Sequence, residues 1–239
     1  RIVTGAYRAI FASKAIGYGY VNTIFRTVIG TTLSVFLTFC TAYPLANRKL
    51  PARTAFTIFY LIPMFFSGGL IPTYLLVRSL GMLDTRLALI VPGLLATFHI
   101  LIMRNFIMTI PSSLEESAMI DGASFFRILV QIIIPLSIPI LATIALWVAV
   151  HHWNSWFDAL IYVRSHTKQV LQMLLRRIVI QDELMALDLE MDEVMGQEDI
   201  TPRSVEAGTV IVTIGPIILV YPFVQRYFVK GIMIGSLKG

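Results

Sequence analysis

Few residues in this chain could do chemistry, and the first candidates are neighbours. His151 and His152 stand shortly before Asp158, and imidazole and carboxylate groups are common metal ligands. Adjacent residues on a helix point about 100° apart, so these two imidazoles cannot easily share one ion. We therefore expect a pair of histidines at a membrane interface and no metal site. His99 lies inside an apolar run, where we expect a neutral imidazole that packs against a neighbouring helix.

The second candidate is an acidic segment, residues 182–206. Its residues 188–193 alternate acidic and apolar side chains, as calcium-binding loops often do. The glycine expected at the sixth loop position and the glutamate expected at the twelfth are both missing, which argues against an EF-hand. A solvated helix with Leu and Met on one side is the simplest interpretation.

The third candidate is the polar stretch that begins after Pro111. Ser112 and Ser113 each precede a glutamate by three residues, a spacing typical of a capping box, so we predict that a helix begins here. On this helix, Leu114, Ser117, Ala118 and Asp121 share one face, and small residues on a face allow another surface to approach closely. Gly122 predicts a turn, and Ala123 follows it. The acidic residues of this stretch are costly in lipid, so it must lie in water.

The elements on either side of this stretch are apolar. Of the 239 residues, 56% are hydrophobic and only 14% are charged, against about a quarter charged in soluble domains. The composition predicts an all-α integral membrane protein that crosses the bilayer several times. We expect five spans, an aqueous loop at 109–128 and a second loop at 151–206. The expected spans cover approximately residues 22–46, 54–77, 87–108, 129–150 and 207–227. Prolines and glycines within these spans predict kinks.

The polar stretch resembles a known family motif. Residues 116–123 read ESAMIDGA, and Ile132 and Pro135 follow at the spacing of the EAA loop of ABC importer permeases. Ser117 replaces the usual second alanine of that motif. The segments 71–85, 153–162 and 229–239 are similar to the carbohydrate-uptake, maltose-importer branch of this family. These permeases usually have six spans, so the resemblance implies an N-terminally truncated single transmembrane domain, 1–239, whose first span precedes residue 1.

The resemblance also implies a mechanism and partners. The loop would carry a cytoplasmic coupling helix that docks on a dimer of separate ATP-binding cassette ATPases, which bind ATP and Mg²⁺. A second permease would complete a heterodimer in the bacterial cytoplasmic membrane, and an extracytoplasmic solute-binding protein would deliver a sugar. Of the coupling residues, Glu116 would make a polar contact, and Ser117, Ala118 and Ala123 would keep the contact close. Asp121 and Gly122 would form the turn.

Other implications of the resemblance concern the substrate. Trp153, Asn154 and Asp158 are the candidates for the substrate path, because an aromatic face and an amide suit sugar rings. The acidic segment 182–206 would either be solvated or form a docking surface for the binding protein. The permease itself is expected to hold no catalytic residue, cofactor or metal.

Two alternative functions remain open. A secondary, ion-coupled carrier would place pairs of acids or histidines inside its spans, and only His99 lies deep in one here. An ABC permease for a non-sugar solute would share the coupling loop. The sequence has no phosphate-binding GxxxxGK[ST] motif and no basic run with interleaved aromatic residues, so neither ATP hydrolysis by this chain nor nucleic-acid binding is expected.

Overall fold

The computed structural model describes residues 14–177 and residues 208, 210, 211, 215 and 218, and all regular elements in this part of the chain are helices. The described residues form two compact units. The first unit contains residues up to Val28, the segment Tyr74–Val91 and the described part of Val150–Pro222. The second unit contains Ile29–Thr73 and Pro92–Ala149.

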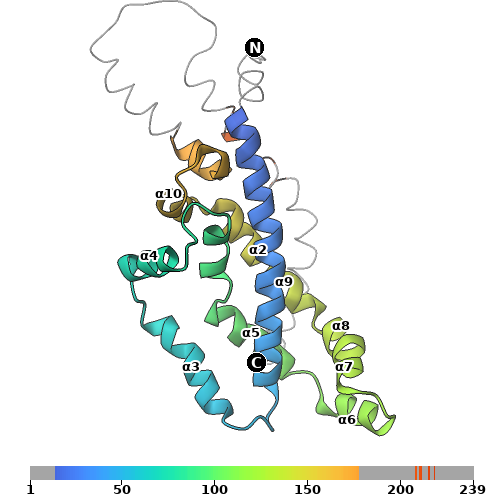
Figure 1. Ribbon diagram of the computed structural model, residues 1–239. Helices are drawn as coiled ribbons and strands as arrows, with labels where there is room; N and C mark the ends of the chain where they lie inside the picture. The colour runs from blue at the N-terminus through green and yellow to red at the C-terminus, as the bar shows by residue number, and fades with distance from the viewer. Residues whose placement is uncertain (1–13, 178–207, 209, 212–214, 216–217, 219–239) are drawn as a thin grey trace, which may run out of the picture. The chain divides into compact units, whose positions relative to one another are not determined.

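The helices follow one another with short connections (Figure 1). In chain order they are α2 (Lys14–Ala46), α3 (Arg53–Phe65), α4 (Leu70–Ser79), η1 (Leu87–Leu89), η2 (Val91–Gly93), α5 (Thr97–Ile107), α6 (Ser112–Ile120), α7 (Phe125–Ile128), the π-helical turn η3 (Leu129–Ile133), α8 (Ile134–Leu136), α9 (Ile138–Asn154), α10 (Phe157–Tyr162) and η4 (His166–Lys168). Residues 171–177 are also helical.

Among the described helices, α2 alone is long and apolar enough to cross a membrane without a break. It has 33 residues, and it begins at Lys14, earlier than the predicted span 22–46. Arg26 lies inside the predicted span, near its start, although a charge is costly in lipid. The structure removes that objection, because the Arg26 side chain is 3% exposed and paired with Asp158.

Three further candidate spans are bent pairs of helices. The pairs Arg53–Phe65 with Leu70–Ser79, Leu87–Gly93 with Thr97–Ile107, and Phe125–Leu136 with Ile138–Asn154 bend by 113°, 52° and 70°. They lie at the positions predicted for spans 54–77, 87–108 and 129–150, but none is one continuous helix. The last pair continues to Asn154, so the predicted loop 151–206 begins later than expected. The predicted span 207–227 lies largely outside the described residues.

Glycine and proline explain where the pairs break. Gly69, between α3 and α4, has φ 83°, a left-handed conformation that glycine adopts without steric cost. Pro92 lies in η2, before the second bend. At the third bend, Pro135 cannot donate a backbone hydrogen bond, and the preceding turn is π-helical, as helices often become next to an interrupted bonding ladder.

The second unit has one apolar core. It contains the buried residues Phe39, Ala42, Leu45, Ile100, Met103, Ile107, Ile128, Ile133, Ile144 and Val148. The end of α2 is fixed to this core by two arginines, because Arg53 and Arg104 both donate from Nε to the carbonyl oxygen of Leu45, at 2.8 and 3.2 Å. Cations at a helix C-terminus satisfy carbonyls that lack an intrahelical partner. These contacts hold the turn after α2 and the end of α5, from which the polar loop starts.

The first unit is held together by polar contacts as well as apolar ones. The buried Asn22 of α2 donates to the carbonyls of Thr167 and Gln169 at 2.8 and 3.0 Å. Asp84, in the turn before η1, accepts from the backbone N–H groups of Arg164 and Ser165. Both contacts bind the segment that follows α10. This segment is therefore attached to two other parts of the unit. Side chains, and not a helix or a strand, provide the hydrogen-bond partners of these four backbone groups.

Asp84 should make the stability of the first unit depend on pH. Hydrogen bonds from the hydroxyl and backbone N–H of Ser165 hold the pKa of Asp84 well below its ordinary value of 3.8. A lowered folded-state pKa means that the carboxylate stabilises the fold above the ordinary value and that this contribution is lost as the pH falls through the folded value. We expect Asp84→Asn to lower the Tm of the detergent-solubilised protein by a constant amount above about pH 5, and by less below about pH 4.

The substitution is conservative for the backbone, because Asp84 has φ 55° and asparagine tolerates that region as well as aspartate does. Glu116→Gln, at an exposed position of the polar loop, is the control and should leave the Tm unchanged. A difference in Tm that stays the same down to pH 3, or that widens, contradicts this role of Asp84.

Candidate functional site

The polar loop begins at Ser112, where the sequence predicts a helix, but without the predicted capping box. Pro111 occupies the N-cap position, and no side chain caps the first turn of α6. Both serines are already inside the helix, so neither has the extended conformation that a capping side chain needs. The helix start is therefore confirmed, and the capping chemistry proposed for Ser112, Ser113 and the two glutamates is wrong.

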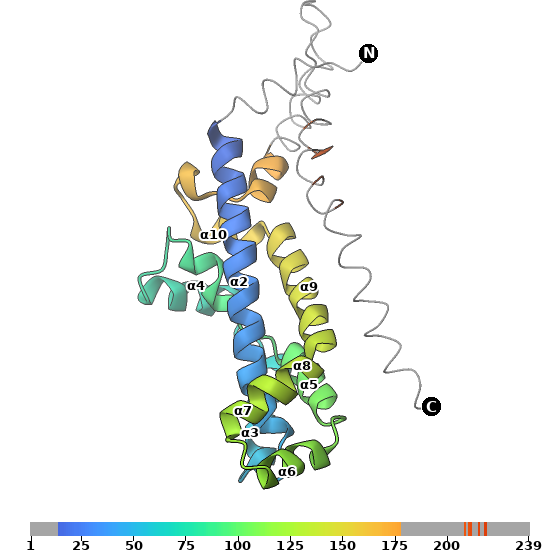
Figure 2. The same ribbon diagram turned by 90° about the vertical axis from the view of Figure 1, so that its right-hand side faces the viewer.

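The end of α6 is a Schellman motif. Gly122 has φ 77°, its N–H donates to the carbonyl of Met119 at 3.1 Å, and the N–H of Ala123 donates to the carbonyl of Ala118 at 2.9 Å. These two bonds satisfy carbonyls at the end of the helix, and the left-handed residue is the position where glycine is favoured. The turn predicted at Asp121 and Gly122 is thus present, and it fixes the direction in which α7 leaves α6 (Figure 2).

One side of this loop packs on its own chain. Ala118 and Ala123 are half-buried against the apolar core of the second unit. Tyr43, near the end of α2, donates from its hydroxyl to Glu115 at 3.5 Å, and its ring lies 5.7 Å from the ring of Phe125. The small side chains thus allow α6 to lie close to the rest of the unit. They leave the other side of the helix free.

The outward side of the loop is a mixture of polar and large apolar groups. Glu116, Ser117, Asp121 and Gly122 are exposed. Beside them lie the exposed apolar residues Met119, Ile120, Phe125 and Phe126, which we call the apolar cluster of the loop; Ile120 is 86% and Phe126 is 72% exposed. Large apolar groups gathered on an aqueous loop mark an interaction surface. The core and the Schellman motif hold the loop, which presents this surface outward.

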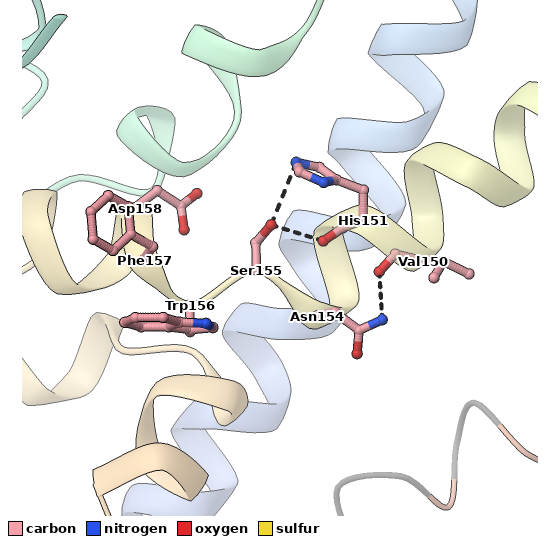
Figure 3. A pocket seen from close by; sticks show the side chains of 7 residues that line it. All are labelled: Val150, His151, Asn154, Ser155, Trp156, Phe157 and Asp158. Atoms are coloured by element: carbon pink, nitrogen blue, oxygen red, sulfur yellow. Dashed lines mark hydrogen bonds between the residues drawn. The ribbon is translucent and has the colours of Figure 1, made fainter. Parts of the chain in front are cut away.

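A separate pocket lies in the first unit, where α9 ends and α10 begins (Figure 3). Its volume is about 500 Å³, and it is lined by Val150, His151, Asn154, Ser155, Trp156, Phe157 and Asp158. The helix stops at Asn154 and resumes at Phe157, so the two residues between them are non-helical and the backbone changes direction. This break places an indole, an amide, an imidazole and a hydroxyl around one opening.

An ion pair next to this pocket joins Arg26, whose side chain is 3% exposed, to Asp158, whose side chain is 26% exposed. The guanidinium of Arg26 forms a two-pronged pair with the carboxylate of Asp158, in which one prong measures 3.1 Å. The same guanidinium donates to Nδ1 of His152 at 3.2 Å and to the carbonyl of Ser155 at 3.2 Å. Since Nδ1 of His152 accepts this bond, the imidazole is neutral. Arg26 therefore ties three groups on both sides of the α9–α10 break to α2.

Of the three residues predicted for the substrate path, two line the pocket and one does not. Asn154 lines the pocket. Asp158 also lines it, but its carboxylate is already bound by Arg26. Trp153 does not line it, and packs with Ile16 and Leu171 in a separate apolar cluster of the first unit. The tryptophan that lines the pocket is Trp156, which follows the end of α9 at Asn154.

The adjacent histidines His151 and His152 also have different surroundings. His152 is 3% exposed and bound to Arg26, whereas His151 is exposed and lies 3.5 Å from the hydroxyl of Ser155. His99 belongs to the second unit, where its ring lies 6.0 Å from that of Trp147.

Sequence reasoning missed two residues of these sites. Arg26 bounds an apolar window and looked like a flanking cation, and only its partner 132 positions away shows its role. The one signal available was the position itself, a cation followed by an uninterrupted apolar run. Tyr43 is one of many aromatic residues in the apolar windows, and nothing in its spacing points to Glu115.

Comparison with known proteins places the chain. Residues 30–234 match the family described as "Binding-protein-dependent transport system inner membrane component". The chain is 43% identical over 235 residues to the Bacillus subtilis polygalacturonan/rhamnogalacturonan transport system permease protein YtcP, covering 98% of this chain and 81% of that one. It is 26% identical over 220 residues to the arabinooligosaccharides transport system permease protein AraQ of Halalkalibacterium halodurans, covering 91% and 73%.

A solved structure agrees. The crystal structure of a bacterial ABC transporter involved in the import of the acidic polysaccharide alginate contains a chain that superposes with a TM-score of 0.84 at 34% identity, covering 93% of this chain and 79% of that one. The apolar composition, the long helix α2, the bent helix pairs and these matches agree with one another. This chain therefore belongs to the binding-protein-dependent transport system inner membrane components: it is a multi-pass helical permease subunit of an ABC importer in the inner membrane, and not an enzyme.

Proposed function

We propose that this permease moves an oligosaccharide across the cytoplasmic membrane after an extracytoplasmic binding protein delivers it. The observation that carries this proposal is the 43% identity, over 98% of the chain, to a permease named for polygalacturonan and rhamnogalacturonan transport. The names of the arabinooligosaccharide and alginate relatives support the same class of substrate.

The loop at 109–128 is the proposed docking site of a cytoplasmic ATPase, one of a dimer that binds the ATP and Mg²⁺. The apolar cluster of the loop would enter a groove of the ATPase, with Glu116 and Ser117 making polar contacts at its edge. Ala118 and Ala123 would serve this contact indirectly, because they hold α6 against the core. Asp121 and Gly122 would fix the exit of the helix through the Schellman turn.

Rigid attachment matters because the ATPase and the permease exchange energy only through contacts that differ between their states. If the loop changed shape when the ATPase subunits moved, their movement would not be transmitted to the rest of the permease. In this chain Ala118 and Ala123 of the loop pack against the core of the second unit, and Glu115 accepts a hydrogen bond from Tyr43. A displacement of α6 would therefore move the end of α2 and the bent span that begins at Phe125.

The pocket at the α9–α10 break is the proposed part of the substrate path. Its indole and amide suit sugar rings, which offer an apolar face and hydroxyl groups. Asn154 and Trp156 would contact the sugar, with Asp158 placed by Arg26 at the rim. Trp153 would not contact the sugar. It would support the end of α9 through its packing on Leu171.

The proposed architecture is a single transmembrane domain that includes a fifth span at 207–227. Loop 109–128 would face the cytoplasm, and the segment 151–206 the outside, where residues 182–206 would be solvated or contact the binding protein. A second, different permease would complete the pathway as a heterodimer.

Purification of the complex in mild detergent, followed by reconstitution, tests the proposal. We expect an ATPase and a second permease to co-elute with this chain, and ATP-dependent uptake of a labelled oligosaccharide once the binding protein is added. Glu116→Ala together with Gly122→Asp should lower uptake about tenfold or more, since the first change removes a polar contact and the second adds a charged side chain in the Schellman turn. Full uptake by that variant contradicts the coupling role, and uptake of a non-sugar solute alone contradicts the substrate class.

A further inference from the structure

We propose that the pocket at the α9–α10 break is a subsite for an acidic sugar, in which Arg176, held against the indole of Trp156, binds the carboxylate. The inference rests on the proposed function, because it names the kind of oligosaccharide that the pocket takes. In this proposal Arg176, which lies outside the pocket lining, determines the preference for acidic over neutral sugars.

The first observation is the position of Arg176. Its guanidinium carbon lies 3.7 Å from the centroid of the Trp156 ring, and Trp156 lines the pocket. A guanidinium that stacks on an indole uses its flat face and keeps its N–H groups, which lie in its plane, for other partners. Arg176 is exposed, and among the described residues it forms no ion pair. It is therefore fixed beside the pocket and available to a carboxylate, which it can bind through two parallel bonds.

The second observation is the balance of charge in the described part of the first unit. The described part of the first unit contains two acidic residues, Asp84 and Asp158. Each is already paired, with Lys168 and Arg26 respectively. Six cations of the same part have no acidic partner there: Lys14, Arg78, Arg86, Arg164, Arg176 and Arg177. The described part of the first unit thus has an excess of positive charge, and the carboxylate within the pocket lining does not oppose an anion, because Arg26 neutralises it.

The third observation is a set of hydrogen-bonding groups suited to hydroxyls. Asn154 uses one N–H of its amide on the carbonyl of Val150 at 3.0 Å, which leaves the other for a ligand. His151 lies across the opening from Trp156 (Figure 3). An aromatic platform, an amide, an imidazole and a nearby guanidinium together fit a sugar ring that carries a carboxylate.

Equilibrium dialysis on the purified permease–ATPase complex tests the subsite, without the binding protein, so that its own selectivity does not enter. The probes are labelled trigalacturonate and its trimethyl ester, which keeps the rings and hydroxyls but has no charge. We expect Arg176→Gln to weaken binding of the acid about tenfold and to leave the Kd of the ester within about twofold, since a charge-assisted bond is lost only with the acid. Trp156→Leu should also weaken binding of the acid more than binding of the ester, because it removes the indole against which the Arg176 guanidinium is held.

Arg177→Gln is the matched control. It removes the same charge at the next residue, which is also exposed, and should change neither Kd by more than about twofold, because a solvated charge is screened by salt. The subsite is contradicted if the wild-type complex does not bind the acid, if Arg176→Gln weakens both probes equally, or if Arg177→Gln has the same effect as Arg176→Gln.

Transport separates this inference from the proposed function. With the binding protein added, uptake of neutral oligosaccharides with no preference for acidic ones overturns the acidic subsite and leaves the proposed function intact. Uptake of a non-sugar solute, with neither kind of oligosaccharide carried, overturns both.

Discussion

Arg26→Ala is expected to lower the free energy of unfolding by about 3 to 5 kcal/mol, enough to prevent most of the permease from accumulating in folded form. The substitution leaves the carboxylate of Asp158, Nδ1 of His152 and the carbonyl of Ser155 without their shared donor. Unpaired polar groups away from water are costly, and a charge more so. The measurement is denaturant unfolding in detergent, together with the amount of protein that elutes as a single species.

Three further variants separate pairing from packing. Arg26→Lys keeps the charge but not the planar fork, so it should lose part of the stability. Arg26→Met combined with Asp158→Leu removes both charges and should be more stable than Arg26→Ala alone, because an apolar pair avoids a stranded carboxylate. Arg78→Ala, at an exposed arginine, should change the stability by less than about 0.5 kcal/mol. If Arg26→Ala folds as well as Arg78→Ala, the ion pair does not hold the α9–α10 break.

Ile120→Asp combined with Phe126→Asp is expected to weaken association with the ATPase by about a hundredfold or more. The two side chains are 86% and 72% exposed in the chain alone, and burying a large apolar side chain contributes about 1.5 to 3 kcal/mol. Losing two such contributions corresponds to at least this factor in Kd. The fold should be unaffected, because neither side chain belongs to the core of the second unit. The measurement is co-purification of the ATPase, quantified by titration of the detergent-solubilised permease.

Leu80→Asp is the control for this pair. Leu80 is also a large exposed residue, at 61%, but it follows α4 and not the coupling loop, so the ATPase should still co-purify. Retention of the ATPase by the Ile120→Asp, Phe126→Asp variant, or equal loss with Leu80→Asp, contradicts docking through the apolar cluster of the loop.

The loop could be predicted in detail because its determinants are local. Pro111 limits the helix start, Gly122 provides the left-handed residue, and the spacing between them sets the length of α6. The prediction erred in the first turn, where two serines suited capping but Pro111 took the N-cap position. It also assigned Ala118 and Ala123 to a partner, although the structure places them against the core. A helix wheel shows which residues share a face, but not which surface that face meets.

The pocket was predicted less well because its determinants are distant in sequence. Whether Trp153 or Trp156 faces the opening depends on where α9 ends, and helix ends are poorly defined by an apolar pattern alone. Arg26 and Asp158 belong to different helices, and no spacing rule joins them. The prolines and glycines did indicate that the spans would bend, but the 113° bend between α3 and α4 depends on how the two helices pack, which sequence does not show.

Site-specific cross-linking tests the central claim most directly, namely that the loop at 109–128 is the contact through which an ATPase drives this permease. Cys40, the only native cysteine, is first replaced by serine, and Ile120→Cys is then introduced into the complete transporter in intact cells. We expect a short bifunctional reagent to join this position to the ATPase subunit, with a yield that changes when ATP is bound. A cysteine at 120 that reacts with a membrane-impermeant reagent from outside the cell, or that forms no cross-link to the ATPase, contradicts the account.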